Sequence, residues 1–341
     1  MKAIELTSPG NFLILEKEIK DLLPESVLVK IHTIGLCGTD FHAFRGKQPF
    51  FSYPRILGHE LGAEVVKIMP ETSEKYNIKI GDKVSIEPYL NCGTCQACLS
   101  NRQNCCEQIR VLGVHQDGGM CEYLQVPASK VHVSNKLSFD QLALVETLGI
   151  GLHAVKRSQL RQGDTVLIVG AGPIGLGIAN FAKSYGAKVC LADFSKSRLD
   201  YAEKKGLLDF PYLVNAQIEP EDLKSLMNDK LPDVIFDATG NKNSMANTFN
   251  LISHGGKIVF VGLFTGEMEF NDPNFHKRET TLMGSRNSLP EDFEEIIKDM
   301  ENGKIDSQIW ITHHVAFDDL PKEFSSFIDS KDSVIKVIVN V

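Results

Sequence analysis

The pattern of hydrophobic and polar positions changes along the chain, from a period of two in the first part to helical spacing and then to alternating strands and helices. In residues 1 to about 135, short apolar runs alternate with turns, and Val27, Val29 and Ile31 occupy every second position of one run. A period of two is typical of half-buried strands. The first stretch is therefore predicted to be a β-rich module that carries any site on its loops.

From residue 137 the apolar positions recur at helical spacing, and Leu144, Leu148 and Val155 fall on one helix face. Short apolar strands then alternate with helix-like runs. The predicted strands are 165–169, 188–192, 212–214, 234–238, 257–263 and 281–283. This alternation predicts an α/β fold with a doubly wound parallel sheet of six strands. A helix at 290–300 and strands at 309–313 and 334–339 complete the chain.

A glycine-rich turn follows the predicted strand at 165–169. Gly170, Gly172 and Gly175 form a GxGxxG pattern that leads into a helix. The glycines allow a tight turn and a close approach to a pyrophosphate, and the helix N-terminus attracts the phosphates. Asp193 ends the next strand about 20 residues later, where an acid binds the adenosine ribose. This indicates NAD rather than NADP; a helix N-cap is the alternative role for Asp193.

Two more predicted strands end in turns at the carboxyl edge of the sheet, where such sheets bind ligands. Thr239 follows the strand at 234–238, and Gly262 and Leu263 end the strand at 257–263. Simple turn formation explains the glycines equally well.

Closely spaced cysteines give the most specific local signal. Cys92, Cys95 and Cys98 are followed by the pair Cys105 and Cys106. Four thiolates close the tetrahedral shell of a structural zinc, which holds a loop without its own core. The spacing leaves Cys105 and Cys106 open as the fourth ligand, and an iron–sulfur cluster is the alternative four-thiolate site.

A second group of metal-binding residue types lies near the N-terminus. Cys37, His59 and Glu60 offer a thiolate, an imidazole and a carboxylate, a set that suits a catalytic zinc with one position left for water or substrate. Thr39 and His42 could pass a proton. The pattern alone is only suggestive, because a lone cysteine is usually a small buried hydrophobic residue.

Composition limits the possible partners and location. The chain has 341 residues, 43% hydrophobic and 23% charged, and no apolar run reaches the roughly 20 residues that span a bilayer. A net charge of −8 argues against nucleic acid as the main partner. The N-terminus shows no export signal, and clustered cysteines favour metal over disulfides, so a cytoplasmic protein is predicted.

With these motifs in place, the chain resembles the zinc-containing branch of the medium-chain dehydrogenase/reductase superfamily along its full length. The matching pieces are 37–40, 58–60, 81–84, the cysteine segment, and the glycine-rich turn with Asp193. The resemblance implies a GroES-like catalytic domain formed by residues 1–150 and 289–341, with a Rossmann NAD-binding domain at 151–288 between them.

The resemblance also implies roles for single residues. It selects Cys106 for the structural zinc. It also implies that Glu146 can serve as a further ligand of the catalytic zinc, in a displaceable or outer position, although helical spacing alone favours a surface position. Thr39 and His42 match proton-relay positions. The implied cofactor contacts are Gly170, Gly172, Pro173, Ile174, Gly175, Asp193, Arg198, Thr239, Gly262, Leu263, Arg286 and Asn287. Arg286 is alternatively a partner for a substrate carboxylate.

The implied activity is oxidation of a secondary hydroxyl of a polyol or sugar acid to a ketone with NAD+, using one catalytic and one structural zinc. The stretches 48–55, 113–119, 275–281 and 284–287 favour a sugar-acid dehydrogenase, with L-iditol (sorbitol) 2-dehydrogenase and L-threonine 3-dehydrogenase as alternatives. A non-catalytic NAD- or zinc-binding protein and a nucleic-acid-binding zinc module are rivals from other classes. A small-molecule substrate and a homo-oligomer, either dimer or tetramer, are expected.

Overall fold

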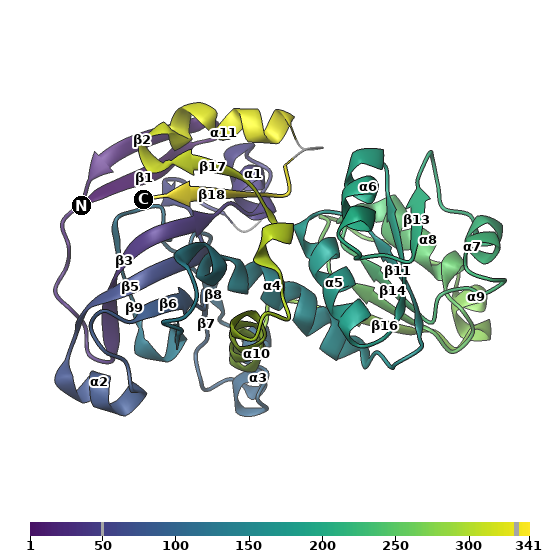
Figure 1. Ribbon diagram of the computed structural model, residues 1–341, viewed down its shortest axis with the longest axis horizontal. Helices are drawn as coiled ribbons and strands as arrows, with labels where there is room; N and C mark the ends of the chain where they lie inside the picture. Colours follow the sequence, from purple (N-terminus) through teal and green to yellow (C-terminus); the bar gives the residue numbers. More distant parts are fainter. Residues whose placement is uncertain (49–50, 331–333) are drawn as a thin grey trace. The chain divides into compact units, whose positions relative to one another are not determined.

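The computed structural model shows that the chain folds into two units (Figure 1). Unit 1 comprises Met1–Gly149 and Ser288–Val341, and unit 2 comprises Ile150–Asn287. Ile150 and Ser288 therefore each fall one residue across the predicted domain boundaries. The structure describes residues 1–48, 51–330 and 334–341. Part of the stretch 48–55 and part of the predicted return segment 289–341 therefore lie outside the described residues.

Unit 1 is built on a seven-stranded sheet in which the two ends of the chain meet. Its strands are β3 (Ser26–Gly35), β5 (Glu60–Ile68), β6 (Lys83–Ile86), β9 (Tyr123–Pro127), β10 (Val131–Val133), β17 (Ile311–Ala316) and β18 (Lys336–Asn340). The order is β10-β6-β5-β3-β18-β17, and β9 also pairs with β3. The last strand of the chain, β18, thus lies between β3 and β17 (Figure 1).

Two smaller strand groups complete the β structure of unit 1. They are the sheet β2-β1-β4, made of β1 (Lys2–Ser8), β2 (Asn11–Glu16) and β4 (Arg55–Ile56), and the ribbon of β7 (Tyr89–Leu90) and β8 (Arg110–Val111). The alternation in β3 has the predicted effect, because Val27, Val29 and Ile31 have no exposed surface. These residues lie in one continuous core that reaches from β1 to β18.

Short helices interrupt the β-rich part. The helices of unit 1, apart from α4, are α1 (Gly38–Phe44), α2 (Pro70–Tyr76), α3 (Gln96–Leu99), α10 (Pro290–Glu301) and α11 (Leu320–Asp329), with 3-10 turns η1 (Gln103–Cys105), η2 (Ala128–Lys130), η3 (Ser307–Ile309) and η4 (Phe317–Asp319). Helix α1 packs on α11, with ring centroids of Phe41 and Phe44 at 5.1 and 4.8 Å from that of Phe324. The prediction that the site residues lie on loops is therefore wrong for Thr39 and His42, which belong to α1. Two turns are too short to show helical periodicity.

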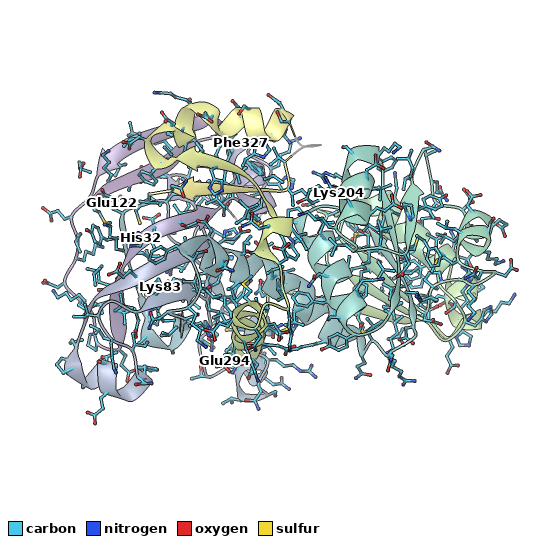
Figure 2. The ribbon with its side chains drawn as sticks, viewed as in Figure 1. His32, Lys83, Glu122, Lys204, Glu294 and Phe327 are labelled. Carbon is cyan, nitrogen blue, oxygen red and sulfur yellow. The ribbon has the colours of Figure 1, made fainter. Side chains whose placement is uncertain are left out.

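Helix α4 (Phe139–Ser158) begins against the large sheet of unit 1. The ring of His32 on β3 stacks on the ring of Phe139, with the ring centroids 4.0 Å apart. Nζ of Lys83 on β6 lies 5.8 Å from the centre of the Phe139 ring; Figure 2 labels His32 and Lys83. A Cβ atom on Gly62 would lie 2.0 Å from the carbonyl oxygen of Phe139, so only glycine permits this contact. Glu146, two helical turns further on, is therefore held by a firmly docked helix start.

Unit 2 has a parallel sheet with the order β13-β12-β11-β14-β15-β16. Its elements are β11 (Thr165–Val169), α5 (Pro173–Ser184), β12 (Lys188–Asp193), α6 (Lys196–Lys204), β13 (Phe210–Leu213), α7 (Pro220–Leu226), β14 (Val234–Asp237), α8 (Lys242–Leu251), β15 (Lys257–Phe260), α9 (Asp272–Lys277) and β16 (Thr281–Gly284). This order confirms the doubly wound α/β fold, in which ligands bind where the strand order reverses, between β11 and β14. Strand β15 is shorter than predicted, because the amides of Val261 and Gly262 both donate hydrogen bonds to the carbonyl oxygen of Asp237 and so leave the regular strand pairing.

Candidate active site

Three predicted metal ligands come together in unit 1. One donor atom each of Cys37, His59 and Glu60 lies within 4.8 Å of the others. Cys37 is the N-cap of α1, His59 directly precedes β5, and Glu60 begins β5. His59 and Glu60 are buried and Cys37 is half-buried. One sulfur, one nitrogen and one oxygen donor at this spacing suit a zinc ion with an open position.

The entry to His59 is fixed by close backbone contacts between glycines. A Cβ atom on Gly118 would lie 2.2 Å from the carbonyl oxygen of Gly58, and one on Gly113 would lie 2.8 Å from the Gly58 nitrogen. Gly58 itself has φ +92°, a conformation that side chains rarely adopt. The backbone that presents His59 therefore has little freedom.

The charges around His59 show that the site attracts a cation. Burial alone would lower the pKa of His59, but Cys37 and Asp40 raise it well above its usual value. Nδ1 of His59 lies 3.9 Å from Oδ1 of Asp40, and among the described residues both atoms lack a hydrogen-bond partner. At this distance the carboxylate places negative charge beside the ring of His59 without a hydrogen bond to it. A divalent ion would satisfy the same negative surroundings that draw a proton to His59.

A buried lysine on the last strand holds Glu60. Nζ of Lys336 lies 2.6 and 2.7 Å from the two carboxylate oxygens of Glu60 and 3.0 Å from the carbonyl oxygen of Leu36. Burial would raise the pKa of Glu60, but Lys336 and His59 lower it overall. Burial would lower the pKa of Lys336, and Glu60 raises it overall. Both shifts describe an ionised pair.

Lys336 was not predicted from the sequence, because 276 positions separate it from Glu60. The available signal was a single lysine inside the apolar run Val334–Val339, where a charge needs a partner. Gly35 was also missed. It pairs with Glu60 between β3 and β5, and a Cβ atom there would lie 2.1 Å from Oε2 of Glu60. Gly35 therefore provides the space for this carboxylate.

Glu146 lies beside the ligand set but outside it. The side chain on α4 is buried, so the surface position that helical spacing favoured is wrong. The phenol of Tyr89 donates a hydrogen bond to Oε1 of Glu146. Burial raises the pKa of Glu146, although His59 opposes the shift, and burial raises the pKa of Tyr89 well above its usual value. Tyr89 was not predicted as a site residue.

The two predicted relay residues share one face of α1, because Thr39 and His42 are three positions apart. Thr39 is half-buried and His42 is exposed. Partial burial lowers the pKa of His42, and the charges of Arg45 and Lys47 lower it further. The imidazole is therefore neutral at pH 7 and able to accept a proton.

The cysteine cluster joins the four sulfurs of Cys92, Cys95, Cys98 and Cys106 within 4.8 Å of one another. Cys106 is buried, whereas Cys105 is exposed and outside the cluster. Backbone amides of Thr94 and Cys95 lower the pKa of Cys92 to about 6. Burial raises the pKa of Cys106 to about 11, although its sulfur accepts the amide of Cys92 at 3.3 Å. Backbone N–H groups that donate hydrogen bonds to the sulfurs, and four sulfurs that converge, suit a closed zinc shell.

In unit 2 the glycine-rich turn has the backbone that a dinucleotide site needs. Gly170 has φ +103°, and a Cβ atom on Gly175 would lie 1.8 Å from the carbonyl oxygen of Gly170. Gly172 is the N-cap of α5, and Pro173 and Ile174 form its first turn. The free amides at this helix N-terminus can bind phosphate.

Asp193 lies at the carboxyl end of β12 beside this turn. Its carboxylate accepts the amides of Ala171 at 2.7 Å and Ser195 at 2.8 Å. The N-cap of α6 is Ser195, so the alternative role of Asp193 as the cap is not realised. Nη1 of Arg198 lies 3.7 Å from the Cβ position of Gly172, which brings a positive charge to the turn.

The remaining predicted cofactor contacts follow other strands of the same sheet. The hydroxyl of Thr239 bonds to Asp237 at 2.6 Å. A Cβ atom on Gly262 would lie 2.2 Å from the nitrogen of Gly240, so the two strand ends touch through their backbones. Leu263 is 70% exposed. Arg286 and Asn287 follow β16, and Asn287 has φ +53°.

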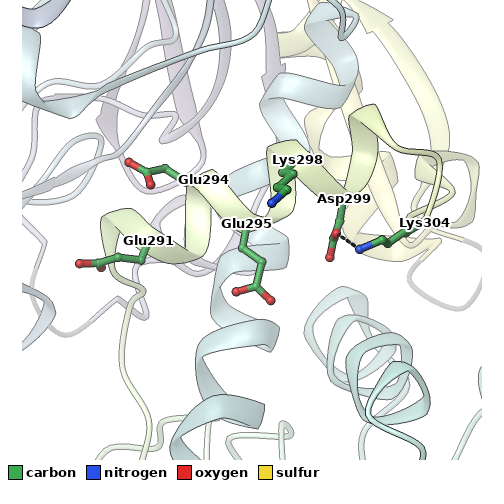
Figure 3. A pocket seen from close by; sticks show the side chains of 6 residues that line it. All are labelled: Glu291, Glu294, Glu295, Lys298, Asp299 and Lys304. Carbon is green, nitrogen blue, oxygen red and sulfur yellow. Dashed lines mark hydrogen bonds and ion pairs between the residues drawn. The ribbon is translucent and has the colours of Figure 1, made fainter.

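A separate pocket lies on α10 (Figure 3). It is lined by Glu291, Glu294, Glu295, Lys298, Asp299 and Lys304. Asp299 and Lys304 form an ion pair at 2.8 Å. None of these residues belongs to the two ligand sets, and the pocket is the charged outer face of an amphipathic helix. None of the described helices is long and apolar enough to cross a membrane.

Comparisons with known proteins agree with both units. Residues 23–136 match the alcohol dehydrogenase GroES-like domain, and residues 173–302 match the zinc-binding dehydrogenase domain. L-galactonate-5-dehydrogenase of Escherichia coli K12 is 42% identical over 340 residues, 99% of this chain and 98% of that protein.

Two solved structures are similar over nearly their whole length. The RspB alcohol dehydrogenase of Escherichia coli CFT073, solved with NADH, has a TM-score of 0.93 at 28% identity and covers 100% of this chain and 99% of its own. L-idonate 5-dehydrogenase of Escherichia coli K-12 has a TM-score of 0.87 at 25% identity, covering 100% and 98%.

Proposed function

This chain belongs to the zinc-containing alcohol dehydrogenase family, and on this premise we propose that it oxidises L-galactonate, or a closely related sugar acid, at a secondary hydroxyl with NAD+. The observation that carries the proposal is the group of one thiol, one imidazole and one carboxylate within 4.8 Å, in a chain 42% identical to an L-galactonate-5-dehydrogenase. The four sequence stretches that favoured a sugar-acid enzyme support the same substrate class.

Cys37, His59 and Glu60 would hold the catalytic zinc. The chemistry that zinc supplies when bound is Lewis-acid activation of the substrate hydroxyl. Asp40 places negative charge beside His59, and Lys336 balances the charge of Glu60. Oxidation then removes a hydride from the carbinol carbon to NAD+ and a proton from the hydroxyl oxygen.

The proton needs a route out, and α1 offers one. The hydroxyl of Thr39 accepts the substrate proton as it gives its own proton toward the neutral imidazole of His42, and His42 then releases a proton to solvent. The lowered pKa of His42 suits this direction of transfer.

In unit 2 the turn from Gly170 to Gly175 and the N-terminus of α5 bind the pyrophosphate, and Asp193 accepts the ribose hydroxyls. A carboxylate at this place favours NAD+, because it repels the 2′-phosphate of NADP+. Thr239, Gly262 and Arg286 are proposed to contact the rest of the cofactor.

Two statements about the whole protein are part of the same proposal. None of the eight cysteines is in a disulfide, which fits a reducing, cytoplasmic environment. We also propose a homo-oligomer, dimer or tetramer, as the resemblance implies. Light scattering of the purified protein tests the second statement.

The substrate is tested by following NADH formation with L-galactonate, L-idonate, L-iditol, sorbitol and L-threonine. We expect the highest kcat/KM with L-galactonate and NAD+. His59→Ala should lower it about 10³-fold or more and reduce the zinc content from two to one per chain. His314→Ala, an exposed histidine on β17, is the matched control and should change neither value. Turnover of L-threonine alone, or with NADP+ alone, contradicts the proposal.

A further inference from the structure

We propose that Tyr89 is a positioning residue, which holds Glu146 off the catalytic metal so that Glu60 and not Glu146 belongs to the resting ligand set. This inference rests on the zinc site of the proposed function. It concerns the only carboxylate among the predicted zinc ligands that the structure leaves outside the set of donors within 4.8 Å.

The contact that carries the inference is fully enclosed. Tyr89 is 3% exposed and Glu146 is 4% exposed, and the phenol donates to Oε1 of Glu146. The ring of Tyr89 also meets Phe293 edge-on, with the ring centroids 6.5 Å apart. The hydroxyl of Ser288 lies beside the same phenol, and Glu146 is the acceptor to which the phenol donates, so this hydrogen bond restrains the direction of the carboxylate.

The two buried carboxylates near the site are restrained by different chemistry. Both oxygens of Glu60 contact the ammonium group of Lys336, which neutralises the charge. The phenol of Tyr89 is neutral, so Glu146 keeps its demand for a positive partner. Beside a divalent ion, the carboxylate of Glu146 would be able to bind the metal, and the hydrogen bond from Tyr89 opposes that movement.

Both sides of the contact are anchored. Tyr89 belongs to the ribbon β7–β8, where it pairs with Val111, and the cysteine cluster begins three residues later at Cys92. Glu146 belongs to α4, whose first residue, Phe139, is stacked by His32. Neither backbone can follow the other if the hydrogen bond is lost. The carboxylate side chain is then the part that moves.

Tyr89→Phe tests the inference, because it removes the hydroxyl and keeps the ring. We expect release of the catalytic zinc to a chromogenic chelator to become about tenfold slower, since Glu146 joins the ligands. We also expect the KM for the sugar acid to rise about tenfold with kcat within threefold of the wild type, because the added ligand competes with substrate. Cobalt exchanged into the catalytic site should show a change in its d–d absorption.

A double-mutant cycle shows whether Tyr89 acts through Glu146. In a Glu146→Gln background, Tyr89→Phe should leave zinc release and KM unchanged. Tyr212→Phe is the matched control, because it also removes a phenol that donates to a carboxylate, Asp222, at 3.0 Å. This control should alter neither zinc release nor KM.

The inference fails if Tyr89→Phe lowers the melting temperature without changing zinc release, or if its effect persists in the Glu146→Gln background. If Tyr89→Phe does not fold, 4-aminophenylalanine at position 89 replaces it. Its amine is a weaker donor than the phenol and should slow zinc release; unchanged release overturns the inference. Zinc release needs no substrate, so a negative substrate panel with the expected release rates rejects the proposed function and leaves the role of Tyr89 standing.

Discussion

The cysteine cluster and the cluster of Cys37, His59 and Glu60 are two metal-ligand sets in the same unit, built in opposite ways. All four cysteines come from one short segment, between β7 and β8. Within it the amide of Cys92 donates to the sulfur of Cys106, and the amide of Cys95 donates to the sulfur of Cys92. The second set takes its donors from α1 and β5 and its neutralising lysine from β18, at the far end of the chain.

This difference reflects what each set has to do. A closed thiolate shell needs only to hold a loop in shape, and local sequence is sufficient for that. A reactive site needs an open position, a fixed histidine and a controlled carboxylate. Those requirements are met by residues that packing brings together: Gly35, Asp40, Tyr89, Glu146 and Lys336.

The largest expected effect tests whether the cysteine cluster is local and closed. Cys95→Ser should remove one zinc per chain and make the segment 92–106 sensitive to protease, because zinc binding at such sites contributes about 10–16 kcal/mol. Cys105→Ser, next to the cluster but exposed, should retain both zinc ions and the protease resistance of the wild type. Zinc analysis and limited proteolysis check both variants. Equal losses in the two would contradict the assignment of Cys106.

A smaller effect is expected at the long-range pair of the second set. Lys336→Met leaves Glu60 buried without its partner, which should lower the free energy of unfolding by about 3–5 kcal/mol. The loss should be smaller when the catalytic zinc is bound, because the ion supplies the missing positive charge. Urea denaturation with and without that zinc, with the cysteine cluster loaded in both samples, measures the difference.

Lys336→Arg is the control for this prediction, because a guanidinium group keeps the charge and can bond both carboxylate oxygens. We expect it to recover most of the lost stability. If Lys336→Met costs the same with and without zinc, Glu60 is not available to the metal, and its place in the ligand set is wrong.

The same contrast explains how far the sequence could be interpreted. The six parallel strands of unit 2 and the cysteine cluster depend on local alternation and short gaps, and both were predicted from the residues alone; the order of the strands was not predicted. A position of Glu146 near the catalytic ligands was expected only from the family resemblance, since a glutamate in an amphipathic helix is ordinarily solvated. Tyr89 could not be found in this way, because a two-residue strand has no periodicity. For Lys336 the apolar run around it indicates a buried charge, but nothing local identifies a partner 276 positions away.

The smallest expected effect concerns proton transfer, a task that the cysteine cluster does not have. The pKa of His42 is lowered, so the imidazole loses its proton at a lower pH than an ordinary histidine does. In the oxidation direction the wild-type rate should therefore rise with pH up to that pKa and stay flat near pH 7. The oxidation rate of His42→Gln should be about tenfold lower at pH 7 and keep rising at higher pH, because hydroxide replaces the missing acceptor.

Arg45→Gln removes one of the charges that lower the pKa of His42, so the inflection of its pH profile should move to higher pH with an unchanged plateau. A pH profile for His42→Gln that coincides with the wild type would exclude His42 from the relay.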